Sequence, residues 1–138
     1  MHFLTISQLA RKAEVNIQTI YYYEKRGLIL SPGRTLNGHR RFPQETIHRI
    51  LFIRKAKSYG FTLKETSELG RYFWKAGKDC LKAKKRIKDK IETLKNTARV
   101  FAKNAECLER LLELCGNNCG RQSCPLLECF TKNVVFKP

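Results

Sequence analysis

The longest regular pattern in the chain is an apolar stripe in its second half. Its members follow one another at alternating steps of four and three residues: Ile87, Ile91, Leu94, Ala98, Phe101, Ala105, Leu108, Leu112 and Cys115. This spacing is typical of a helix that supercoils against a partner helix. Continued backward, the register reaches Cys80, 35 residues before Cys115, which is five whole heptads. The pattern predicts a dimerisation helix over residues 78–115 with a cysteine at each end of one stripe.

The two cysteines of this stripe would lie close together in a dimer. In an antiparallel coiled coil the start of one helix lies beside the end of the other. Cys80 would therefore meet Cys115 of a second copy of the chain. A homodimer of this kind builds a thiolate site between its subunits.

The first half of the chain carries the signals of two short helices joined by a tight turn. Thr5 and Gln8 form a capping box before a helix from Ile6 to Ala13. Asn16 is a good N-cap for a second helix, from Ile17 to Arg26, and Gly27 suits the left-handed position after it. This arrangement predicts a helix-turn-helix.

A turn-rich stretch follows the second helix. Leu28–Leu30 and Arg40–Phe42 flank it as two expected strands, and Asn37-Gly38 suits the paired positive φ angles of a type I′ turn. We interpret the stretch as a two-stranded wing. Pro43 is expected in the first turn of a third helix that continues to Tyr59.

The remaining elements complete a mainly α fold. Thr62 and Glu65 repeat the capping box and predict a fourth helix to about Tyr72, and Gly77 predicts a break. The segment after Cys115 has no sustained period. The expected domains are a winged helix-turn-helix domain over 1–75, the antiparallel coiled-coil helix over 78–115, and a ligand loop with a short terminal helix over 116–138.

Charge narrows the class of partner. The chain has 28 Lys and Arg against 12 Asp and Glu, a formal net charge of +16. Such a surplus indicates a polyanion, nucleic acid or an anionic membrane surface. No apolar run of about 18 residues is present to span a bilayer, so we expect a cytosolic protein. The six cysteines then favour metal ligands, redox groups or buried thiols over disulfides.

Several motifs together resemble the MerR family of bacterial transcription regulators. They are Thr19-Ile20, Tyr22 to Leu28, Asn37 to Phe42, Phe52-Ile53-Arg54, Gly60 to Leu63, and Glu65. The resemblance covers nearly the whole chain and implies a homodimer on a pseudo-palindromic operator in double-stranded promoter DNA. It also implies a repressor that becomes an activator when metal binds, by distorting the DNA for RNA polymerase. One departure is Tyr21, where the family usually has arginine.

Residues of the second helix and the wing are the expected DNA contacts. Such side chains fit phosphate positioning better than base reading. The inner side of the tyrosine run must also supply core packing. The expected set is Gln18, Thr19, Tyr21, Tyr22, Tyr23, Arg26, Arg34, Asn37, Gly38, His39, Arg40, Arg41, Arg54 and Lys64.

The chain also resembles the metal-sensing branch of the family, which has a cysteine at the start of the dimerisation helix and two more around its end. This resemblance implies Cys80, Cys115 and Cys124 as ligands, with Cys119 as a possible extra one. The spacing is closest to the mercury(II) sensors. No histidine or aspartate follows Cys115, so hard cations find few ligands there. Soft ions remain, with mercury(II) first and zinc(II), cadmium(II) or lead(II) as alternatives.

The same residues also fit other classes of protein. An iron–sulfur redox regulator would use Cys115, Cys119, Cys124 and Cys129, and a constitutive DNA-binding dimer would leave its cysteines inert. Buried packing remains an alternative for the stripe cysteines, and Cys107 lies outside the stripe. An enzyme is disfavoured because the three histidines have no evident nucleophile beside them.

Overall fold

A computed structural model describes residues 2–30, 32–74, 79–116 and 124–131. The chain divides into two compact units, Met1–Arg86 and Ile87–Pro138. The expected break at Gly77 and the candidate ligand Cys119 lie outside the described residues.

The first unit begins with the two helices that the caps predict. α1 spans Ile6–Ala13, and both hydrogen bonds of its capping box are present: Thr5 N–H donates to Gln8 Oε1 at 2.9 Å, and Gln8 N–H donates to Thr5 Oγ1 at 3.3 Å. α2 spans Ile17–Lys25, with the Thr19 N–H donating to Asn16 Oδ1 at 2.7 Å. Gly27 follows with a φ of +69°. The helix-turn-helix is confirmed.

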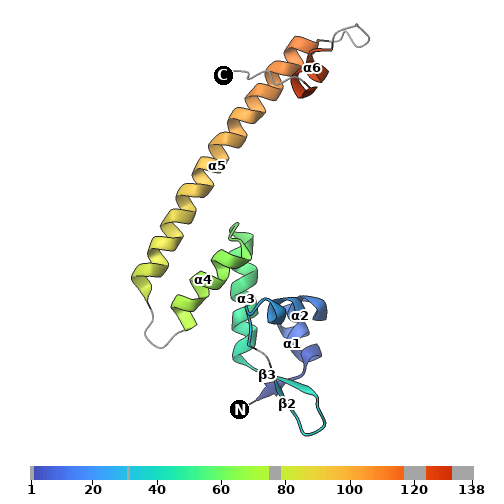
Figure 1. Cartoon of the computed structure of the whole chain (residues 1–138), viewed down its shortest axis with the longest axis vertical. Helices are drawn as coiled ribbons and strands as arrows, with labels where there is room; N and C mark the ends of the chain where they lie inside the picture. Colours follow the sequence, from blue (N-terminus) through green and yellow to red (C-terminus); the bar gives the residue numbers. More distant parts are fainter. Residues whose placement is uncertain (1, 31, 75–78, 117–123, 132–138) are drawn as a thin grey trace. The chain divides into compact units, whose positions relative to one another are not determined.

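The wing differs from its prediction in three respects. Its strands are β2, Gly33–Arg34, and β3, Arg40–Pro43, and β1, Phe3–Leu4, adds a third strand in the order β1-β3-β2. The expectation of a strand at Leu28–Leu30 was wrong because Ile29, 2 % exposed, packs into the core instead of pairing. Figure 1 shows the β2–β3 hairpin projecting beside the N-terminus.

The turn of the hairpin is not type I′. Gly38 has a φ of +78°, but among the described residues Glu14 alone of the non-glycines has a positive φ, so Asn37 does not. The Gly38 N–H donates to the Thr35 carbonyl at 2.8 Å and the Thr35 N–H to the His39 carbonyl at 2.9 Å. This is a three-residue loop with a left-handed glycine closing it.

Two further helices complete the first unit's globular part. α3 spans Glu45–Ser58 and α4 spans Leu63–Trp74. Pro43 ends β3, so its expected place in a helical turn was wrong. The second capping box is confirmed, since Thr62 N–H donates to Glu65 Oε2 at 2.8 Å and Glu65 N–H to Thr62 Oγ1 at 3.2 Å.

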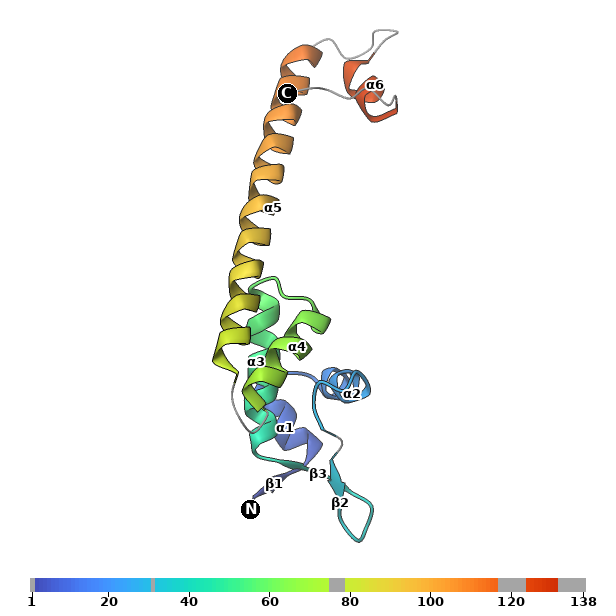
Figure 2. The same cartoon turned by 60° about the vertical axis from the view of Figure 1, so that its left-hand side comes forward.

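The core joins these elements into one domain. α1 packs on α2, α3 and β3, and α4 packs on α3, as the two views show (Figure 1, Figure 2). The largest fully buried side chains are Phe42, Leu9, Ile20, Ile50 and Thr66. They come from α1, α2, β3, α3 and α4, so every major element contributes one.

The long helix and the terminal helix follow. α5 spans Cys80–Cys115 as one helix of 36 residues, and α6 spans Pro125–Thr131. The mainly helical fold with a winged helix-turn-helix and a long C-terminal helix is confirmed. No helix in the described parts of the chain is long and apolar enough to cross a membrane.

Candidate nucleic-acid interface and metal centre

The second helix of the helix-turn-helix presents a polar and aromatic outer face. Tyr21 and Tyr22 are 39 % and 42 % exposed, and Gln18 and Arg26 are exposed beside them. The Arg26 guanidinium carbon lies 5.3 Å from the centre of the Tyr22 ring. These four side chains form an outward surface suited to a DNA backbone.

Two of the predicted DNA contacts on this helix interact with other parts of the protein. Tyr23 is only 4 % exposed and belongs to the core, and this burial raises the pKa of its hydroxyl. It is the inward ring that the tyrosine run requires, so we leave it out of the proposed contact set. Thr19 is half-buried, and both its N–H and its hydroxyl donate to Asn16 Oδ1.

The hairpin supplies basic side chains on a fixed backbone. Arg34 Nη1 donates to the Gly38 carbonyl at 3.1 Å, which ties the two sides of the loop together. His39 is exposed and Arg41 half-exposed. A surface hollow of about 540 Å³ lies beside the sheet, and His2, Arg34 and Arg41 line it. The hollow adds His2, which the sequence did not single out, to the basic surface.

Arg40 has partners that spacing alone did not reveal. Its guanidinium forms an ion pair with Glu24 of α2, and its Cζ lies 5.0 Å from the centre of the Tyr21 ring. The wing and the second helix are thereby joined through one side chain. Glu24 was missed because nothing in the local pattern distinguishes it from a solvated acid.

Arg54 and Lys64 occupy different settings. Arg54 Nη1 donates to the Ala13 carbonyl at 2.9 Å, and the guanidinium lies 3.6 Å from the Glu14 carboxylate. It is engaged with the turn after α1. Lys64 is exposed in the first turn of α4, and among the described residues no hydrogen bond or ion pair engages its side chain.

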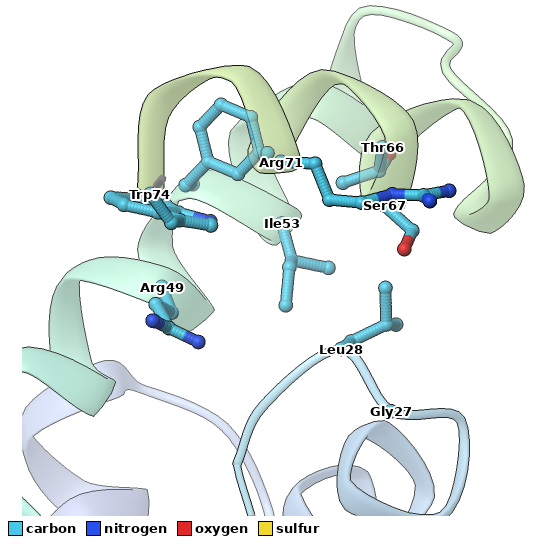
Figure 3. Close-up of a pocket in the computed structure, with 10 residues that line it drawn as sticks. Gly27, Leu28, Arg49, Ile53, Thr66, Ser67, Arg71 and Trp74 are labelled. Atoms are coloured by element: carbon cyan, nitrogen blue, oxygen red, sulfur yellow. The ribbon is translucent and has the colours of Figure 1, made fainter. Parts of the chain in front are cut away.

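A cavity of about 170 Å³ lies between the end of α2, α3 and α4 (Figure 3). Arg49 and Arg71 lie at opposite ends of it, with Ile53 and Leu28 between them. The Arg49 guanidinium carbon lies 5.4 Å from the centre of the Trp74 ring. Because the two cations do not converge, the cavity does not assemble a site for one small anion.

The candidate metal ligands that the structure describes, Cys80, Cys115 and Cys124, are free thiols. Cys80 and Cys124 are exposed and Cys115 is half-buried. Within the described residues no group of three or more His, Cys, Asp or Glu side chains is placed to hold an ion. A helix of 36 residues is about 54 Å long, so Cys80 and Cys115 of one helix cannot share an ion.

Asp79, the residue just before α5, interacts with the first turn of that helix and was not among the predicted site residues. The Lys82 N–H donates to Asp79 Oδ1 at 3.1 Å, and Lys82 Nζ lies 3.2 Å from Asp79 Oδ2. The backbone hydrogen bond first, then the lysine side chain, hold the pKa of Asp79 below its usual range. Asp79 thus caps the helix that begins at Cys80, and an aspartate just before a helix is a readable N-cap signal.

Comparisons with known proteins agree with this fold. The mercuric resistance operon regulatory protein of Bacillus cereus is 36 % identical over 135 residues, covering 92 % of this chain and 96 % of that protein. The crystal structure of the regulator MerR from Bacillus megaterium in complex with mercury(II) is 32 % identical with a TM-score of 0.70, covering 94 % of this chain and 100 % of that one. A lead(II)-bound regulator from Ralstonia metallidurans has a TM-score of 0.81 at 23 % identity, over 92 % and 98 % of the two chains, and supports the fold.

Residues 4–72 match the sequence profile described as the MerR HTH family regulatory protein. The matched segment contains the helix-turn-helix, the wing, α3 and most of α4. The expectation of a DNA-binding regulator and not an enzyme is confirmed by this match. The chain belongs to the MerR family of helix-turn-helix transcription regulators.

Proposed function

We propose that this chain is a homodimeric, metal-responsive regulator of transcription, and that its inducer is a soft thiophilic ion, with mercury(II) first. The observation that carries the proposal is the uncovered stripe of α5 with a cysteine at each end. Along it Ile87 is 39 % exposed, Leu94 43 % and Phe101 66 %. Apolar side chains at heptad spacing are stable in water when a second helix covers them.

The length of α5 supports an intersubunit metal site. Since Cys80 and Cys115 lie about 52 Å apart along one helix axis, they can contribute to one ion only from different subunits. An antiparallel partner brings the opposite ends together. Cys124, just before α6, is the proposed third ligand, and three thiolates suit a soft ion.

The proposed DNA surface consists of the outer face of α2 together with the wing. Its members are Gln18, Thr19, Tyr21, Tyr22, Arg26, Arg34, Asn37, Gly38, His39, Arg40 and Arg41, with Lys64 on α4. A dimer would present this surface twice to a pseudo-palindromic promoter. The proposal places the protein on promoter DNA in the bacterial nucleoid.

The proposed switch is a linkage between metal and DNA shape. The ion favours one arrangement of the two α5 helices, and each helix passes that bias to its own winged domain. Operator affinity need change little, because what differs between the two states is the distortion imposed on the promoter. RNA polymerase would then engage the promoter only when the metal-bound dimer has realigned it.

The similarity to the mercuric resistance regulator and to the mercury-bound MerR structure supports mercury(II) over other soft ions. Zinc(II), cadmium(II) and lead(II) remain alternatives, and a site for them would draw on Cys119 as a fourth sulfur. The choice is testable by titration of the reduced protein with each ion. Thiolate-to-metal absorption gives the number of sulfurs, and transcription in vitro from the protein's own promoter gives the response.

Single substitutions test the ligand set, with Cys107 as a matched control because it lies off the stripe. Cys80→Ser, Cys115→Ser and Cys124→Ser should each abolish metal-dependent transcription and leave promoter binding within about threefold, whereas Cys107→Ser should behave as wild type. Loss of promoter binding in all three would contradict the separation of metal and DNA sites. Transcription indifferent to every ion would favour a constitutive regulator.

A further inference from the structure

The carboxylate of Glu24 lies in an unusual place for an acid on a DNA-binding surface. Glu24 sits on α2 between Tyr22 and Arg26, and its side chain is only 16 % exposed. It forms an ion pair with Arg40, whose side chain is 28 % exposed, 16 residues later on β3. The pair therefore joins the second helix to the wing in a partly desolvated setting, where a charge-assisted hydrogen bond is strong.

A second contact fixes the same guanidinium from another direction. The Tyr21 ring lies 5.0 Å from Arg40 Cζ, within the range of a cation–π interaction. Arginine is planar and carries five N–H donors, so one ion pair does not exhaust it. Carboxylate and ring together give Arg40 a single orientation instead of the many that a solvated arginine samples.

We propose that Glu24 is a positioning residue that fixes Arg40 and thereby raises the preference of the protein for its operator over other DNA. The inference rests on the proposed promoter-binding function. Phosphate contacts set the register of a protein on the duplex, and register decides whether the base and shape contacts of an operator can form. An arginine held in place favours one register, whereas a mobile one binds any phosphate within reach.

Electrostatics alone predicts the opposite effect of Glu24 on the affinity for operator DNA. Glu24 places a negative charge beside a polyanion, so neutralising it should strengthen binding to every DNA. Positioning predicts that the same change weakens operator binding and leaves non-specific binding equal or stronger. The ratio of operator to non-specific affinity therefore separates the two accounts.

The experiment uses the full-length dimer with Glu24→Gln, which keeps the shape of the side chain and removes its charge. Glu45→Gln is the matched control, because Glu45 is an exposed acid at the start of α3. Affinity is measured for the promoter fragment that the wild-type protein protects in a footprint and for a scrambled fragment, at two salt concentrations. We expect the ratio to fall about tenfold for Glu24→Gln and to stay unchanged for Glu45→Gln.

A double variant asks whether the effect passes through Arg40. In an Arg40→Ala background, Glu24→Gln should cause no further loss of the ratio. Thermal melting and the salt slope of non-specific binding show whether each variant is folded and binds DNA. A ratio that is unchanged or higher in Glu24→Gln, or an equal fall in the Arg40→Ala background, overturns the inference. If the wild type itself does not prefer its promoter, the proposed function fails instead.

Discussion

Arg54 on α3 donates a hydrogen bond to the backbone carbonyl of Ala13, 41 residues earlier, at 2.9 Å. Ala13 is the last residue of α1, where carbonyls have no partner within the helix. The next residue, Glu14, has a φ of +53° and lies 3.6 Å from the same guanidinium. One side chain of α3 thus closes the turn on which the orientation of α2 depends.

We therefore expect Arg54 to contribute more to the stability of the fold than to DNA binding. Arg54→Ala should lower the free energy of unfolding by about 1 kcal/mol, since the hydrogen bond is charge-assisted and the side chain is partly exposed. Thermal unfolding measures the effect, with Lys57→Ala as the control for removal of an exposed cation from α3. Equal melting temperatures for the two variants would contradict the assignment.

A methyl group at Gly70 should disturb the packing of Trp74 against Phe52, whose ring centres lie 5.5 Å apart. A Cβ there would lie 2.9 Å from Trp74 Nε1 and 3.4 Å from Phe52, so the indole must move. Gly70→Ala should cost about 1 kcal/mol of stability, because overpacking exceeds the gain in helix propensity. Trp74 is the single tryptophan, so its fluorescence reports the shift directly.

The same helix offers the control for this prediction. Ser67→Ala changes the lining of the same cavity without adding atoms toward Trp74. It should leave the emission spectrum of Trp74 unchanged. An unaltered spectrum in Gly70→Ala as well would show that the packing at this position is looser than the contacts indicate.

The N-cap at Asp79 should make the start of α5 sensitive to pH. Because the Lys82 N–H and ammonium lower the pKa of Asp79 in the folded state, the stabilisation is complete at neutral pH. It is lost as the pH falls through that lowered pKa. Asp79→Ala should speed amide exchange at Lys82 and Ala83 at neutral pH, and the difference from wild type should vanish in acid.

Asp89→Ala provides the matched loss of an acid within the same helix, where no cap is involved. It should leave exchange at Lys82 and Ala83 unchanged. In the metal titration, Asp79→Ala should also weaken metal binding, since a frayed first turn no longer holds the Cys80 thiolate in place. If the Asp79→Ala variant showed normal amide exchange and normal metal affinity, the cap would have no part in the metal site.

The heptad register predicts a difference between two adjacent exposed residues of α5. Phe101 is 66 % exposed and lies on the stripe, whereas Val100 is 56 % exposed and lies off it. Phe101→Glu should weaken dimerisation at least tenfold by burying a charge in the seam, and Val100→Glu should not. Sedimentation over a range of concentrations measures both, and equal effects would contradict the register.

The local elements of this protein follow from its sequence. The caps at Thr5, Asn16 and Thr62 each involve partners three residues away, so the hydrogen bonds form wherever those residue types occur. The stripe of α5 is likewise a matter of period, readable without a structure. These signals were enough to predict the helix-turn-helix, α4 and the long helix.

The tertiary structure decided what depends on distant residues. The strand at Gly33–Arg34 follows from its pairing with β3, and the burial of Ile29 follows from the fit of the core; local propensity encodes neither. The Glu24–Arg40 pair and the Arg54–Ala13 hydrogen bond join positions 16 and 41 residues apart, and only chain folding brings such groups together. The spacing of Cys80 and Cys115 already predicted that they would meet across two copies of the chain, and the structure adds that one continuous helix, α5, joins them.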